Sequence, residues 1–190
     1  VLLIARMDMT GGLVTFSKLP IKRCEFTPFK NPILSSIQER IGRKGFLETE
    51  LETPNGPLLV ISSHLYSLHG THADGIRIYQ LKQIFKKTKK KRESMTSMLM
   101  GDLNEDTLKN PVRFNEVLSA ENFINSAALS GKAIEPSYRP ENPLTQTRFN
   151  NGPFPMRLDQ ILISNLQNLG LKMTSNDILK QPKDPLSDHD

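Results

Sequence analysis

Polar side chains with the chemistry of catalysts or ligands stand where apolar strands are expected to end. His64 closes the apolar segment 58–63, and Asp102 and Asn104 follow Gly101 at the end of another apolar segment. A carboxylate beside an amide suits a divalent cation or a phosphate, because hard cations take oxygen ligands and an amide NH₂ donates to phosphate oxygens. Each feature also has a structural interpretation: a strand-end histidine is more often structural, and Asp and Asn equally often cap a turn.

A carboxylate inside an apolar strand adds a third position. Asp159 lies within the apolar segment 158–163, where an unpaired carboxylate is costly to desolvate. Ser187, Asp188 and His189 follow later in the chain. A pair between Asp159 and His189 would fix the tautomer of the imidazole and raise its basicity. Three strand-end positions in this order indicate a site for acid–base chemistry far more specifically than any one of them.

Alternating strands and helices are expected to position these residues, with antiparallel hairpins mixed in. A Pro-Asn-Gly-Pro turn joins two of the strands, and the glutamates at 48, 50 and 52 are expected on a solvated face. The strands are predicted at residues 13–17, 44–52, 58–63, 95–100 and 158–163 and the helices at 74–90 and from Asn110 (N-cap) and Pro111 onward, with a long loop at 130–157. The pattern predicts the α/β class and one domain over residues 1–190.

Composition narrows the class of protein without choosing a ligand. The 190 residues are 37% hydrophobic and 24% charged, which is too apolar for a disordered chain. The single cysteine, Cys24, excludes an internal disulfide and disfavours a structural zinc site. No apolar stretch reaches the length of a membrane span, so we expect a soluble monomer, with the cytoplasm slightly favoured.

The net charge of +5 fits any phosphate-bearing partner. Part of it comes from the basic run at residues 86–92. A solvated helix end explains such a run better than a nucleic-acid patch, because lysines are favourable near a helix C-terminus.

The ordered motifs resemble those of the endonuclease/exonuclease/phosphatase superfamily of metal-dependent phosphoesterases. The resemblance covers nearly the whole chain and rests on residues 12–21 (GLVTFSKLPI), 44–46 (KGF), 61–65 (ISSHL), 101–104 (GDLN), 157–162 (RLDQIL) and 187–189 (SDH). It implies a four-layer sandwich of two mixed β-sheets flanked by helices, incomplete at both ends.

The resemblance also implies Mg²⁺-dependent hydrolysis of a phosphoester by in-line attack of water, with Mn²⁺ as a substitute metal. His189 would activate the water, and Asp159 would orient His189. Asp102 and Asp188 would belong to the metal environment, with Asp102 also a candidate for proton transfer. His64 and Asn104 would bind the substrate phosphate, and His64 would also assist the leaving group.

One departure from the family pattern concerns the metal. The principal ligand of the family is a glutamate in a Gln–Glu motif that belongs before the start of this sequence, which indicates a fragment. Gln38–Glu39 has the right letters, but it follows the Ser-Lys-Leu-Pro-Ile element instead of a strand. The sequence therefore leaves open whether these residues hold the metal by themselves.

The substrate is the least defined part of the prediction. Residues 142–144, 153–159 and 185–189 resemble the neutral sphingomyelinase-like branch, which favours a phospholipid. A DNA or RNA nuclease of the same superfamily is the alternative, although three Tyr and no Trp offer few platforms for stacking bases. A non-catalytic basic binding module is the alternative from another class, and the intact strand-end carboxylates argue against it.

Overall fold

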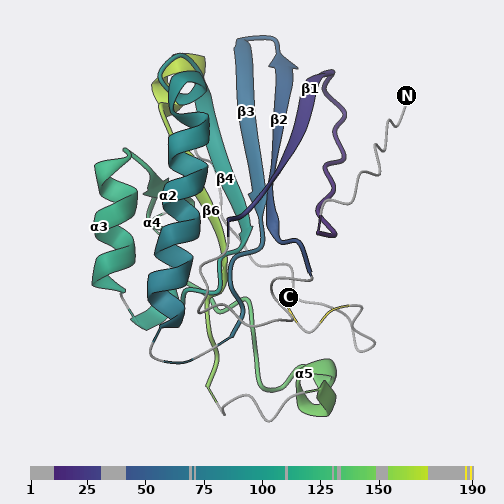
Figure 1. The fold of residues 1–190 in the computed structure, drawn as a ribbon, viewed down its shortest axis with the longest axis vertical. Helices are drawn as coiled ribbons and strands as arrows, with labels where there is room; N and C mark the ends of the chain where they lie inside the picture. The colour runs from purple at the N-terminus through teal and green to yellow at the C-terminus, as the bar shows by residue number, and fades with distance from the viewer. Residues whose placement is uncertain are drawn as a thin grey trace.

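The computed structural model describes residues 11–30, 42–68, 70, 72–109, 111–129, 131, 134–148, 154–170, 187 and 189. Within them one six-stranded mixed sheet has the strand order β1-β2-β3-β4-β6-β5 (Figure 1). The strands are β1 (Ile21–Pro28), β2 (Gly45–Thr53), β3 (Gly56–Ser63), β4 (Thr96–Asp102), β5 (Ile124–Asn125) and β6 (Asp159–Ser164). The helices are α2 (Ala73–Arg92), α3 (Val112–Ala120), α4 (Ser126–Leu129), α5 (Pro143–Arg148) and the 3₁₀ turns η1 (Thr107–Lys109) and η2 (Leu166–Leu169). The predicted α/β class is confirmed, and the second sheet of the sandwich stays a prediction.

The connections bring the ends of three strands to one edge of the sheet. β2 and β3 form the predicted antiparallel hairpin, and α2 carries the chain from β3 to the parallel strand β4. β6 then runs antiparallel to β4, so it begins where β3 and β4 finish. This edge lies at the lower end of the sheet in Figure 1.

Helix α2 covers one face of the sheet and builds the core there. Leu81, Ile84 and Phe85 are fully or almost fully buried in one cluster with Leu59 and Leu99 of the sheet. Their spacing along the chain is that of one helical face, which is why the pattern predicted this helix.

No helix in the described part of the chain is long and apolar enough to cross a membrane.

One expectation about the strands is wrong, and another holds only in part. Residues 13–17 form no strand, and Phe16 is 66% exposed. The strand paired with β2 on its outer side is β1, which the sequence did not predict. The face with the glutamates is solvated only at Glu52, which is exposed; Glu48 is 1% exposed, and Lys91 of α2 reaches its carboxylate at 2.8 Å.

Helix boundaries shift by small amounts from the expected ones. Pro111, and not Asn110, occupies the N-cap of α3, and Asn110 lies outside the described residues. The segment 130–157 is not wholly a loop, since it contains α5. Neither difference concerns His64, Asp102, Asn104, Asp159 or His189.

The basic run ends α2, as the helix-end interpretation predicts, and several of its members have partners. Lys87 pairs with Glu25 at 2.9 Å, and Arg92 pairs with Glu121 at 2.6 Å. Burial alone would lower the pKa of Lys91, but its hydrogen bonds to Glu48 and Glu50 outweigh that effect and raise the pKa above the ordinary value. Much of this charge therefore stabilises the fold.

Candidate active site

The edge where β3, β4 and β6 meet places two carboxylates next to each other. Asp102 ends β4 and Asp159 begins β6, and the two residues are direct cross-strand partners. Side chains of direct partners lie on the same face of a sheet, with Cβ atoms about 5 Å apart. The position before Asp102 must be glycine, because Gly101 has φ +130° and a Cβ there would lie 2.1 Å from the carbonyl oxygen of Ser63.

Asp159 and His189 form the pair that the sequence suggested. Asp159 Oδ2 lies 2.7 Å from His189 Nδ1. The ring of Tyr138 meets the imidazole edge-on, with 5.5 Å between ring centroids, and the backbones of Tyr138 and His189 form a β-bridge. A carboxylate on one ring nitrogen fixes the tautomer and orientation of the imidazole.

A serine from the segment before β6 holds Asp159 in place. Ser137 is fully buried, and its hydroxyl oxygen accepts hydrogen bonds from the backbone N–H groups of Leu158 and Asp159. Burial alone would raise the pKa of Asp159. The hydrogen bond and charge of His189, with further contributions from Ser137 and Arg157, outweigh burial and hold that pKa below its ordinary value.

Asp102 has the opposite electrostatic character. Its carboxylate lies 3.5 Å from His64 Nε2 and accepts the backbone N–H of Asn104 at 2.9 Å. Burial raises the pKa of Asp102, the neighbouring charge of Asp159 adds to that increase, and the two histidines oppose it. Two adjacent carboxylates with pKa values shifted in opposite directions are suited to different roles in acid–base chemistry.

Asn104 lies in the wall of this cluster. It is 9% exposed, adopts a left-handed backbone with φ +51°, and donates an amide N–H to the carbonyl oxygen of Leu65 at 3.3 Å. Lys44 donates to the same carbonyl at 2.9 Å. Leu65 directly follows His64, so Asn104 and Lys44 both fix the strand end that carries the histidine.

Sequence reasoning missed some of the residues that support the site. Ser137 and Tyr138 lie in a proline-rich segment without periodicity, and no local signal marks them. Arg157 was noted only as part of a motif. It is 4% exposed, and its guanidinium donates to the backbone carbonyls of Asp159 and Glu135, both at 2.9 Å, so it ties β6 to the segment that carries Ser137.

Of the residues that the sequence analysis considered for a metal site, Asp102 is described, and Asp188, Gln38 and Glu39 lie outside the described residues. Among the residues that are described, no three His, Cys, Asp or Glu side chains lie close enough together to hold a metal ion. Asp102 nevertheless fits a hard cation, because a carboxylate whose burial and acidic neighbour disfavour its charge is stabilised by a cation beside it.

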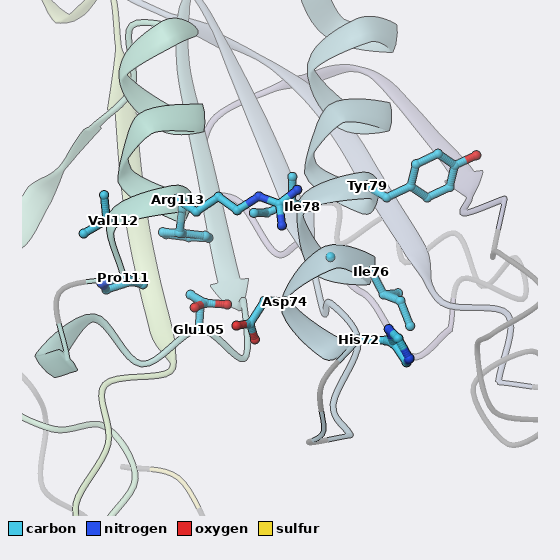
Figure 2. Close-up of a pocket in the computed structure, with 11 residues that line it drawn as sticks. His72, Asp74, Ile76, Ile78, Tyr79, Glu105, Pro111, Val112 and Arg113 are labelled. Carbon is cyan, nitrogen blue, oxygen red and sulfur yellow. The ribbon is translucent and has the colours of Figure 1, made fainter.

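A pocket of about 600 Å³ lies between the first turns of α2 and α3. Figure 2 shows Asp74 and Glu105 close together, between Pro111, Val112 and Arg113 on one side and Ile76, His72 and Tyr79 on the other. None of His64, Asp102, Asn104, Asp159 or His189 lines it. The pocket is therefore separate from the cluster, although Glu105 directly follows Asn104.

This chain is similar to known proteins in structure. No family model and no curated protein sequence matches it. A β-hairpin deletion mutant of beta toxin from Staphylococcus aureus is 26% identical with a TM-score of 0.72, covering 94% of this chain and 64% of its own. An F277A, P278A mutant of beta toxin from the same organism, with bound magnesium ions, is 24% identical with a TM-score of 0.68, covering 91% and 59%. Sphingomyelinase C from Streptomyces griseocarneus is 24% identical with a TM-score of 0.66, covering 82% and 53%.

These similarities confirm the resemblance that the motifs indicated. The structures to which this chain is similar belong to the endonuclease/exonuclease/phosphatase superfamily and include its sphingomyelinase branch. The chain spans less than two thirds of the length of each of these structures.

Proposed function

We propose that the protein is a metal-dependent phosphoesterase that hydrolyses a phosphodiester or phosphomonoester by in-line attack of water. The observation that carries this proposal is the convergence of Asp159–His189 and Asp102–His64 at one edge of the sheet. Two carboxylate–imidazole pairs beside each other supply both the base and the acid that phosphoester hydrolysis needs. The superfamily of its structural neighbours supports the same chemistry.

His189 is proposed as the group that activates the water. Asp159 binds Nδ1, so Nε2 is the ring nitrogen that would take a proton from the attacking water, and the resulting imidazolium would stabilise the negative charge on the phosphoryl oxygens. As the new P–O bond forms, the bond to the leaving oxygen breaks, and that oxygen needs a proton. His64, supported by Asp102, is proposed to supply it.

Asp102 and Asp188 are proposed to belong to the environment of a Mg²⁺ ion. When bound, the ion supplies positive charge against the non-bridging oxygens of the phosphate. Asn104, whose amide lies in the wall of the cluster, is proposed to donate a hydrogen bond to a phosphate oxygen. The magnesium ions in the S. aureus beta toxin structure support this metal.

A phospholipid such as sphingomyelin is the substrate that we favour. The support is the match to sphingomyelinase C together with the sphingomyelinase-like segments before β6 and around His189. The arrangement of basic residues gives no reason to prefer nucleic acid, since Lys87, Lys91 and Arg92 are paired with carboxylates of the fold.

The substrate is tested by assaying the full-length protein with Mg²⁺ on sphingomyelin vesicles, plasmid DNA and inositol phosphates. We expect hydrolysis of sphingomyelin, and chelation by EDTA should abolish it. Activity on DNA alone would overturn the lipid assignment and leave the hydrolase standing. Absence of hydrolysis on all three substrates would contradict the proposed function.

A further inference from the structure

The backbone segment that follows His64 is held by a backbone group of β4 and by side chains of α2. Leu65 donates its N–H to the carbonyl oxygen of Asp102 at 3.0 Å, which ties the segment to β4. Gln80 of α2, fully buried, accepts the N–H of Tyr66 at 2.8 Å. Arg77, one helical turn earlier, donates to the carbonyls of Tyr66 at 3.3 Å and Leu68 at 3.4 Å.

Arg77 also binds the second loop that carries site residues. Its Nε lies 2.8 Å from Oε2 of Glu105, the residue directly after Asn104. Its remaining terminal nitrogen pairs with Asp74 at the start of α2. One guanidinium therefore joins the loop after β3, the loop after β4 and the first turn of α2.

The burial of Arg77 makes this arrangement rigid. The residue is 5% exposed, and the side chain of Glu105 is 12% exposed. A buried arginine keeps its charge and presents its donors in a fixed planar fork, so it holds several acceptors at set angles. A lysine has the charge but a single nitrogen on a flexible stem, so it cannot reproduce these bonds together.

We propose that Arg77 is a positioning residue for the reaction. It holds the His64 loop and the Asp102–Asn104 loop at their working separation, and it touches none of the reacting groups itself. This inference rests on the proposed function for its catalytic consequence. The bonds of Arg77 to Tyr66, Leu68 and Glu105, which we call the clamp, can also be measured without any substrate.

Arg92 provides a matched control on the same helix. It is 6% exposed, pairs with Glu121 at 2.6 Å, and donates to the backbone carbonyls of Phe85 and Glu121. It lies at the opposite end of α2 from the site, as Figure 1 shows for the two ends of that helix. Arg77→Lys and Arg92→Lys therefore each remove the hydrogen bonds of one buried guanidinium, at the two ends of one helix, and Arg92→Lys also removes its contacts over the rings of Phe85 and Phe123.

The test compares these two variants of the full-length protein by thermal melting, phosphodiesterase kinetics and amide hydrogen exchange. We expect similar losses of melting temperature in both. Arg77→Lys alone should lower kcat on the order of tenfold or more, with KM little changed, because small misplacements of reacting groups are costly. Exchange should accelerate about tenfold or more at the amides of Leu65, Tyr66 and Asn104 in Arg77→Lys and stay unchanged there in Arg92→Lys.

Equal kinetic losses in the two variants, or no local acceleration of exchange in Arg77→Lys, would overturn the positioning role. If the wild-type protein hydrolyses none of the substrates, the proposed function fails, and the exchange pattern alone decides whether the clamp exists. A loss of protection confined to the two loops would then support the clamp, and its absence would refute it.

Discussion

Asp159 and His189 are 30 positions apart in the chain and become neighbours through the bridges on Tyr138. Met156 and His189 both pair with the backbone of Tyr138, which brings the imidazole to the start of β6. The buried Ser137 beside it fixes the backbone of Asp159. At the scale of single residues, the pair therefore depends on a segment that contributes no acid or base to the reaction.

The pKa shift of Asp159 predicts how stability depends on pH. Its folded-state pKa lies below the ordinary value, so its ionisation stabilises the fold at pH values above the unfolded pKa. That contribution is lost as the pH falls through the folded-state pKa. We expect Asp159→Asn to lower the free energy of unfolding near neutral pH, and this effect to shrink as the pH falls below the ordinary pKa of an aspartate and through the lowered pKa of Asp159.

Urea unfolding of the wild type and Asp159→Asn across this pH range measures the difference. Glu116→Gln, which changes an exposed carboxylate on α3, is the control and should change stability little at any pH. A difference between wild type and Asp159→Asn that grows as the pH falls would contradict the account.

The sequence could predict the acids and bases of the site but not their supports. His64, Asp102, Asn104 and Asp159 stand at ends of strands whose apolar patterns are readable, and the structure brings them to one edge together with His189. Ser137 and Lys44 act through backbone groups of residues distant in the chain, and local patterns hold no information about such contacts. The roles of these residues in the reaction stay predictions.

At the scale of elements, strands β3 and β4 approach each other so closely that only glycine fits at position 101. The backbone there is left-handed, and a Cβ would lie 2.1 Å from Ser63 O. Since His64 follows Ser63 and Asp102 follows Gly101, forcing the strands apart would separate this part of the site.

Gly101→Ala is therefore expected to destabilise the protein by about 3 kcal/mol or more and to remove activity. Gly75→Ala is the matched control, because Gly75 lies within α2 and a Cβ there meets nothing within 4 Å. That change should stabilise the fold by about 0.5–1 kcal/mol, as alanine favours a helix over glycine. Denaturant unfolding measures the free energy of unfolding of both variants. If Gly101→Ala loses no more stability than Gly75→Ala does, the close approach is refuted.

Elements with a regular local pattern were predictable, whereas contacts between elements were not. Helix α2 was predictable because its buried residues repeat at helical spacing, and the β2–β3 hairpin because its turn is strongly marked. The alternation of Glu48 and Glu50 indicated a solvated face, yet Lys91 covers them from α2. A salt bridge between residues 43 positions apart leaves no trace in a local pattern.

At the scale of the whole molecule, the chain is similar over 94% of its length to a structure of which it covers 64%. The edge of the sheet with His64, Asp102 and Asp159 lies within the described residues, whereas Asp188 and Gln38–Glu39 lie outside them. The net charge of +5 adds little to the choice of substrate, because the lysines that suggested nucleic acid are partly used within the fold.

The most direct test of the central claim is the turnover of His189→Ala in the full-length protein, on sphingomyelin with Mg²⁺, together with its melting temperature. We predict that the wild type hydrolyses the substrate and that His189→Ala abolishes turnover, because the imidazole bound to Asp159 activates the water. The melting temperature should fall no further than that of Asp159→Asn, because both changes break the Asp159–His189 pair and alanine keeps the backbone bridge of residue 189 to Tyr138. Undiminished turnover, or a loss of melting temperature well beyond that of Asp159→Asn, would contradict the account.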